Sequence, residues 1–436
     1  EVFDFWGKAF ELMLILLERG EAQKTKVLSI IGRSIRGFTS NAQIEMLDNA
    51  IRKIVSINGR YWPEALNSIK ATIEYDSKNI SEEASAALDR WLDLLSPKEA
   101  NLPEKLKILV TNPPWEHHKD DDGHYVDVAA NNAKALAIEL SQDIGKLTPH
   151  LNLLLIGEQK QSFAFGYQLA QDADDAEQLL EISLSHLVSI QQPDSRLVLG
   201  LFQGLFEKSP QLWQENIDRL LTDDRLISYY PDFIRTGDIK KLHLDTLILL
   251  INRGALSPNQ ANVLSYGSVT DGIEPDVIAD FCLQLAKLGN QASWAALNVI
   301  YMYCFSKPSC LKELREELKS LVTSVPLHKD QRSTATDLHH WRDLAGKLLK
   351  VRDQKLAVAL ASQLIAGSKH GFDHGDIWSF IKPLLLELMT DYGDVLWPIF
   401  GDAIVQADGM DSYWLQQLLD RENSLVVTTP RVLSVI

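Results

Sequence analysis

Cysteines and glycine-rich turns are scarce in this sequence, and each scarcity argues against a class of chemistry. Three of the 436 residues are cysteines (Cys282, Cys304 and Cys310), too few for a disulfide framework or a four-cysteine zinc site, and this predicts reduced, buried thiols. No G-x-x-x-x-G-K-S/T sequence occurs, so the chain has no P-loop. No G-x-G occurs either, and most dinucleotide-binding domains need that turn. We therefore expect a cytoplasmic protein without a cofactor.

Basic residues and long apolar runs are also few. Lys plus Arg total 43 against 59 Asp plus Glu, and the resulting net charge of −16 argues against broad nucleic-acid binding. The charge-free stretch 288–306 is diluted by Gly289, Asn290 and other polar residues, so it predicts a buried helix and no membrane span. The chain opens at Glu1 without Met or a basic leader, from which we expect a fragment with no secretory signal.

The sequence is rich in apolar residues at helical spacing. Residues 62–73 carry them at 62, 65, 66, 69 and 73, and a second helix is framed by Ser81 as N-cap and by Ser96-Pro97 as its end. About twenty such segments follow one another with Pro or Gly breaks. They predict an all-α fold, an irregular α-solenoid of stacked helical hairpins that is HEAT- or armadillo-like in repeat size, with no central sheet. An irregular helical globule is the alternative, although single cores seldom exceed about 250–300 residues.

Two stretches interrupt the helical pattern. Residues 101–127 contain paired prolines, six acids and three histidines, and residues 324–336 are mostly polar. We therefore expect helical-repeat blocks over 1–100, 128–325 and 326–436, the last continuing beyond the fragment, and an irregular insertion or turn over 101–127.

The interruption at 101–127 contains the residues best suited to catalysis or metal binding. The sequence KILVTNPPW at 107–115 resembles the Asn-Pro-Pro-aromatic loop of N6-adenine methyltransferases, but the missing G-x-G turn favours a rigid turn capped by Trp115. Imidazole and carboxylate groups that suit a divalent cation follow, although three consecutive acids do not fit an EF-hand and favour a solvated acidic turn. These groups belong to His117, His118, Asp120, Asp121, Asp122 and His124.

Aromatic and histidine pairs elsewhere have no nucleophile beside them. Tyr229-Tyr230 and Tyr301-Met302-Tyr303 are typical of packing between helices, or of a groove that holds a partner. His339-His340-Trp341 and the group at 370–374 are expected as core or surface histidines. We predict no catalytic, cofactor-binding or metal residue. The candidates for partner contact are Trp115, His117, His118, Asp120, Asp121, Asp122, Tyr229 and Tyr230.

Several local phrases are similar to one bacterial family. They are Tyr61-Trp62-Pro63-Glu64-Ala65-Leu66, Tyr75-Asp76, Leu94-Leu95-Ser96-Pro97, and Trp115 followed by Asp120-Asp121-Asp122-Gly123. These phrases resemble the degenerate, HEAT-like repeat regions of large bacterial STAND- or NACHT-type anti-phage defence proteins. The resemblance covers mostly residues 60–125 and carries over no catalytic residue. It implies repeats that sense a ligand while a neighbouring effector or ATPase domain of the same polypeptide acts.

These observations together predict a binding protein. A solenoid spreads ligand contacts over many repeats, so we expect a non-catalytic protein-interaction or sensor region of a larger bacterial defence-type protein, with a protein or peptide ligand and no membrane partner. A HEAT-type scaffold for complex assembly or trafficking shares the fold and remains an alternative. An enzyme with a metal or methyltransferase-like site near 112–127 is a more remote alternative.

Overall fold

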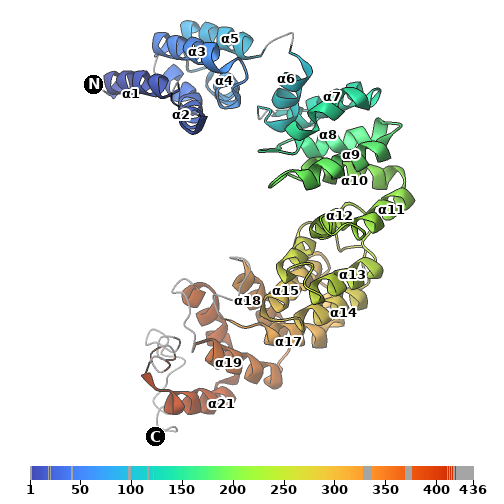
Figure 1. Cartoon of the computed structure of the whole chain (residues 1–436). Coiled ribbons are helices and arrows are strands. Elements are labelled where there is room, and N and C mark those ends of the chain that lie inside the picture. The colour runs from blue at the N-terminus through green and yellow to red at the C-terminus, as the bar shows by residue number, and fades with distance from the viewer. Residues whose placement is uncertain are drawn as a thin grey trace. The chain divides into compact units, whose positions relative to one another are not determined.

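The protein is built almost entirely of helices (Figure 1). The computed structural model describes residues 2–409 except 18, 20, 41–42, 97–99, 115–116, 121, 328–335 and 369–375, together with residues 411, 413, 415 and 418. Within those residues the strands are β1 (His117–Lys119) and β2 (Tyr125–Asp127), which pair antiparallel as one hairpin. The predicted all-α fold of stacked helical hairpins without a central sheet is confirmed.

The chain divides into two compact units, Glu1–Asp218 and Arg219–Ile436. Their boundary falls inside the block 128–325 that we expected from the sequence. We refer to them as unit 1 and unit 2 and describe each by itself.

Unit 1 begins with a helical stack in which alternate helices run parallel. Its members are α1 (Val2–Leu16), α2 (Glu21–Ser40), α3 (Ile44–Asn58), α4 (Pro63–Asp76) and α5 (Glu82–Leu95). The Trp62 indole donates to the Leu28 carbonyl at 3.0 Å, and Arg36 forms an ion pair with Asp76 at 2.6 Å. Because these contacts advance in the same direction along α2 and α4, the two helices are parallel and pack directly on each other, while α3, which connects them along the chain, packs against α2 and α5. As predicted, the Ser81 side chain caps α5, accepting from a backbone N–H of its first turn.

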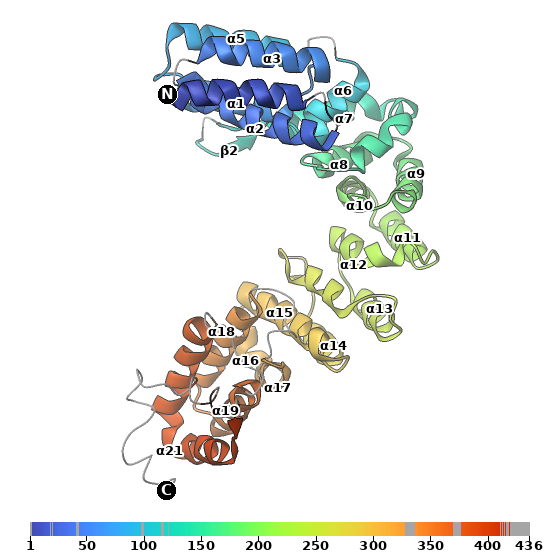
Figure 2. The same ribbon diagram turned by 60° about the vertical axis from the view of Figure 1, so that its left-hand side comes forward.

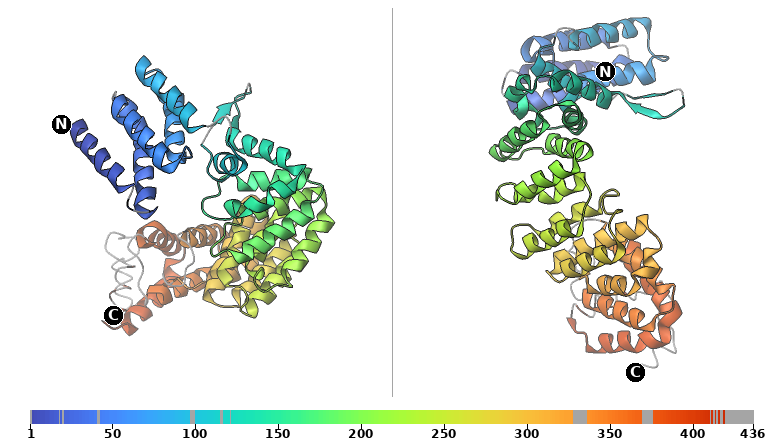
Figure 3. Two further views of the ribbon diagram at one scale, coloured as in Figure 1. Left: turned by 45° about the horizontal axis from the view of Figure 1, so that its top comes forward. Right: turned by 90° about the vertical axis from the view of Figure 1, so that its right-hand side faces the viewer.

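The interruption at 101–127 is short and only partly irregular. It begins with α6 (Leu102–Leu106), which opens with a capping box between Asn101 and Glu104 and continues into a π-helical turn, η1 (Lys107–Thr111). The β1–β2 hairpin then projects from the helices as a short arm (Figure 3). Asp127 ends the hairpin and caps α7 (Val128–Ser141) by accepting from the Ala130 N–H at 2.9 Å.

The second half of unit 1 contains its closest helix packing. It comprises η2 (Ile144–Lys146), η3 (Thr148–Leu154), α8 (Ser162–Asp172), α9 (Ala176–Ser189), α10 (Arg196–Lys208) and most of α11 (Pro210–Leu220), near the end of which the boundary with unit 2 falls. Gly200 lies against Phe163 and Tyr167, and Gly204 against Tyr167 and Ala170, so α8 and α10 are parallel neighbours. A Cβ atom at Gly200 would lie 2.7 Å from the Tyr167 amide nitrogen and closer still to the Phe163 carbonyl oxygen. Only glycine permits such a backbone approach.

Unit 2 is a two-layered stack of helices that follow one another in chain order (Figure 2). Its elements are η4 (Ile227–Tyr229), α12 (Tyr230–Phe233), η5 (Ile234–Thr236), α13 (Lys241–Asn252), η6 (Pro258–Ser265), α14 (Pro275–Ala286), α15 (Asn290–Ser306), α16 (Cys310–Glu313), α17 (Arg315–Ser324), α18 (Asp337–Leu349), α19 (Gln354–Ser368), η8 (Ile377–Ile381) and α21 (Lys382–Gln406). In layer A, η6 contacts α15, α15 contacts α18, and α18 contacts η8 and α21. In layer B, α14 contacts α17 and α17 contacts α19.

The centre of unit 2 is α15, which corresponds to the charge-free stretch of the sequence. Its residues from Ala292 to Tyr303 are buried except Met302, so the predicted buried helix is confirmed. None of the helices that the structure describes is long and apolar enough to cross a bilayer. The three cysteines are free and buried, as predicted.

Candidate functional site

The candidates at 115–124 are only partly described by the structure. Trp115 and Asp121 lie outside the described residues, and of His117 and His118 only the backbone, within β1, is described. The Asp120 carboxylate accepts from the backbone N–H groups of Asp122 at 3.1 Å and His124 at 2.8 Å. Asp120 therefore closes the hairpin turn. Among the described residues, no three His, Cys, Asp or Glu side chains gather as a metal site.

The tyrosine pair at 229–230 packs between helices. Tyr230 is buried, and Tyr229 is partly buried and stacks on Phe233 with ring centroids 5.7 Å apart. These contacts pack the short helices η4 and α12 into the core.

A different group of rings, partly buried and partly exposed, lies in unit 2. Tyr301 and His340 stack with centroids 4.2 Å apart and 17° between their planes. Phe305 lies 6.5 Å from Tyr301, while His339 lies 5.9 Å from His340 and 6.2 Å from Phe380. These residues come from α15, α18 and η8, three successive elements of layer A. We call Tyr301, Phe305, His339, His340 and Phe380 the aromatic ladder.

The ladder rests on a buried polar network. Asn298 on α15 donates its amide N–H groups to the Asn262 side chain of η6 at 3.3 Å and to the Asp337 carboxylate of α18 at 2.9 Å. A carboxylate only accepts, so this contact identifies the Asn298 nitrogen, and its oxygen faces His340 Nδ1 at 2.8 Å. Nδ1 of His340 must therefore carry the proton. The network joins η6, α15 and α18 by directional bonds and fixes the imidazole tautomer.

The environment of His340 keeps its ring uncharged at neutral pH. Burial, together with the neighbouring charge of His339, lowers the pKa of His340 to about 4, against the opposing influence of Asp337 and Asp343. With Nδ1 protonated, Nε2 of the neutral ring is a hydrogen-bond acceptor. None of the described residues bonds to Nε2.

The other side of Tyr301 holds an ion pair. The Tyr301 hydroxyl donates to Asp343 Oδ2 at 3.0 Å, and Lys347 Nζ lies 2.7 Å from the same oxygen and 5.6 Å from the Tyr301 ring centroid. Burial and the Asp343 carboxylate raise the pKa of Tyr301 to about 12. Burial would raise the pKa of Asp343, but hydrogen bonds from Lys347 and Tyr301 hold it below its usual value. Oδ1 of Asp343 has no bonding partner within the described part of the chain.

This arrangement is suited to binding. The Phe305 side chain is 64% exposed and His339 is also exposed, whereas the network beneath them is buried. Tyr301 remains protonated and His340 remains neutral at pH 7. The ladder therefore offers the exposed rings of Phe305 and His339, and the adjoining His340 Nε2 and Asp343 Oδ1 are hydrogen-bond acceptors.

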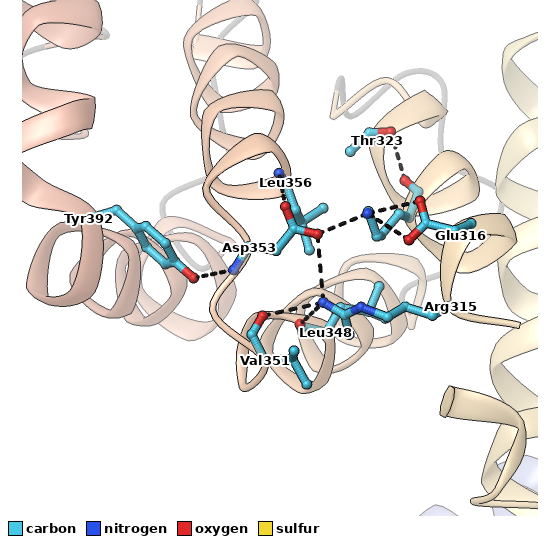
Figure 4. Close-up of polar contacts among 9 residues, drawn as sticks. Arg315, Glu316, Thr323, Leu348, Val351, Asp353, Leu356 and Tyr392 are labelled. Atoms are coloured by element: carbon cyan, nitrogen blue, oxygen red, sulfur yellow. Dashed lines mark hydrogen bonds and ion pairs between the residues drawn. The ribbon is translucent and has the colours of Figure 1, made fainter. Parts of the chain in front are cut away.

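A second polar cluster, at the junction of α17, α18, α19 and α21, is saturated by its own contacts (Figure 4). Asp353 caps α19, accepting from the Leu356 N–H at 3.1 Å, and forms an ion pair with Lys319 at 2.8 Å. Arg315 donates to the Leu348 carbonyl at 2.9 Å, and the Tyr392 hydroxyl accepts from the Asp353 N–H at 2.8 Å. These bonds hold consecutive repeats together, so we assign the cluster to the scaffold.

Open hollows lie elsewhere. One of about 440 Å³ is lined by Arg352, Gln354 and residues 390–395, and another of about 430 Å³ lies between α1 and α3. The acids that line the first, Asp391 and Asp394, are exposed. Neither hollow brings together the ladder's combination of rings and acceptors.

The sequence singles out Tyr301, His339 and His340 but does not connect them. Their separation of about forty residues matches the spacing of adjacent layer A helices, and this periodicity is the signal that could have paired them. No protein-family model, no curated protein and no solved structure matches the chain.

Proposed function

We propose that this chain is a non-catalytic protein-interaction region that binds a protein or peptide on the aromatic ladder. The supporting observation is that two exposed rings, Phe305 and His339, flank a ring stack of the buried Tyr301 on the partly buried His340 that a buried hydrogen-bond network holds in place. Exposed aromatic side chains on a rigid support are characteristic of the residues that dominate binding energy at interfaces.

On the resemblance stated above, the region is the sensor or regulatory part of a larger bacterial defence-type protein, and a neighbouring effector or ATPase domain carries out the chemistry. The free, buried thiols support a reducing, cytoplasmic location.

The test is affinity capture with crosslinking from bacterial cells, with and without phage infection, followed by quantitative mass spectrometry. The double variant Phe305→Ala, His339→Ala removes the two exposed rings of the ladder and leaves the residues of the buried network unchanged. Leu249→Ala is the control, because Leu249 is 57% exposed on α13, away from the ladder. We expect a partner that wild type and Leu249→Ala retain and the double variant loses. Equal capture by all three proteins, or by none, would refute the proposal.

A further inference from the structure

Two acceptors beside the ladder have no bonding partner within the described residues. Nε2 of His340 and Oδ1 of Asp343 are not bonded by any residue the structure describes, and they belong to side chains three residues apart on α18. Residues at that helical spacing are neighbours, with Cβ atoms about 5–6 Å apart. Both side chains contact Tyr301: the His340 ring stacks on its ring, and the other oxygen of Asp343, Oδ2, accepts from its hydroxyl. A ligand that fills this position must supply donors.

The same position already holds one cation. Lys347 places its ammonium between the Asp343 carboxylate and the Tyr301 ring. A point charge satisfies one carboxylate oxygen, whereas a planar donor fork can reach two acceptors and stack on an aromatic face. Phe305, one helical turn after Tyr301 and 64% exposed, provides that face. The net charge of −16 attracts cationic partners to the chain.

We infer that the ligand of the aromatic ladder is a basic peptide segment, and that an arginine of this segment stacks on Phe305 while its guanidinium donates to Asp343 and His340. The inference rests on the proposed function and adds the chemistry of the partner. It also assigns separate roles to the two kinds of residue, because Phe305 supplies the stacking surface and Asp343 supplies the charge.

The test uses fluorescein-labelled decapeptides of one sequence in which three spaced positions are all arginine, all lysine, all citrulline or all glutamate. Citrulline keeps the planar shape of arginine without its charge. Fluorescence anisotropy should give the tightest binding for the arginine peptide and binding about tenfold weaker for the citrulline peptide. The glutamate peptide should not bind.

The variants separate stacking from charge. We expect Phe305→Ala to weaken the arginine peptide about tenfold and Phe305→Trp to retain it. Asp343→Asn should abolish the preference for arginine over citrulline, and Leu249→Ala should match wild type. Equal affinity for arginine and citrulline, no peptide binding, or an unchanged Phe305→Ala variant overturns the inference. If peptide binding fails while capture of a partner still requires Phe305, only this inference falls. If Phe305→Ala leaves both unchanged, the proposed function falls with it.

Discussion

The glycine at the crossing of α8 and α10 allows a prediction in which two chemically identical substitutions have opposite effects. Gly200→Ala would place a methyl group 2.7 Å from the Tyr167 amide nitrogen and even closer to the Phe163 carbonyl oxygen. Both neighbours are backbone atoms of α8. The steric clash can therefore be removed only if α8 and α10 move apart. Overpacking of this kind costs about 1–3 kcal/mol.

Separation would also weaken the bonds that join the two helices. Gln171 donates to the Gly204 carbonyl at 3.0 Å, Lys208 donates to the Ala173 carbonyl at 2.9 Å, and Tyr167 bonds to Glu207. Each such hydrogen bond contributes about 1 kcal/mol. The gain in helix propensity from alanine, about 1 kcal/mol, offsets part of the loss. We therefore expect Gly200→Ala to lower the free energy of unfolding of unit 1 by about 3 kcal/mol.

Gly37→Ala is the matched control. Gly37 lies inside α2 and is exposed, and its added Cβ atom would lie more than 4 Å from every described atom outside its chain neighbours and its own helix backbone. Without a clash, helix propensity alone acts, and Gly37→Ala should raise the free energy of unfolding by about 0.5–1 kcal/mol.

The assay is urea unfolding followed by circular dichroism at pH 7, with hydrogen exchange to locate the change. Gly200→Ala should lower the unfolding midpoint and speed exchange in α8 and α10, whereas Gly37→Ala should raise the midpoint. A Gly200→Ala variant as stable as Gly37→Ala would refute the close packing of these helices.

Three further predictions concern unit 2. His340 has a pKa of about 4 when folded and 6.5 ordinarily, so the unfolded chain takes up the proton first as pH falls; about 3 kcal/mol of stability should be lost between pH 6.5 and 4. His340→Gln should flatten that dependence in urea titrations, and an unchanged slope would contradict the assignment. Asp353→Ala removes the cap of α19 and the partner of Lys319, and should cost about 1–2 kcal/mol in the same titrations, whereas Asp353→Asn, which keeps the cap, should cost less. Burial raises the pKa of Cys304 to about 12 and that of Cys282 further, so a thiol reagent at pH 8 should label no cysteine in the native protein and three in urea; rapid native labelling would contradict their burial.

The helices were predictable because their signals are local. Ser81 caps α5 and Pro63 occupies the first position of α4, both within a few residues of the apolar pattern they frame. The β1–β2 hairpin was not predicted, since its strands are three residues long and show no useful alternation.

The ladder could not be predicted because it depends on tertiary register. His340 and Trp341 are adjacent in sequence, yet His340 stacks on Tyr301 of layer A while the Trp341 indole donates to the Val322 carbonyl of layer B at 3.0 Å. Which of two neighbouring side chains faces the next repeat is decided by helix rotation, which no local pattern records. The Asn298 bond to Asp337 likewise joins residues that only packing brings together.

The buried polar network and the exposed rings of the ladder tolerate substitution differently, and this has an evolutionary consequence. Substitutions at Phe305 or His339 fall on the surface, where most changes alter stability by less than about 0.5 kcal/mol, while changes at Asn298 would leave buried groups unsatisfied. Substitutions at Phe305 and His339 can therefore accumulate in descendants that still fold, and under the proposed function each of them would change which partner is bound.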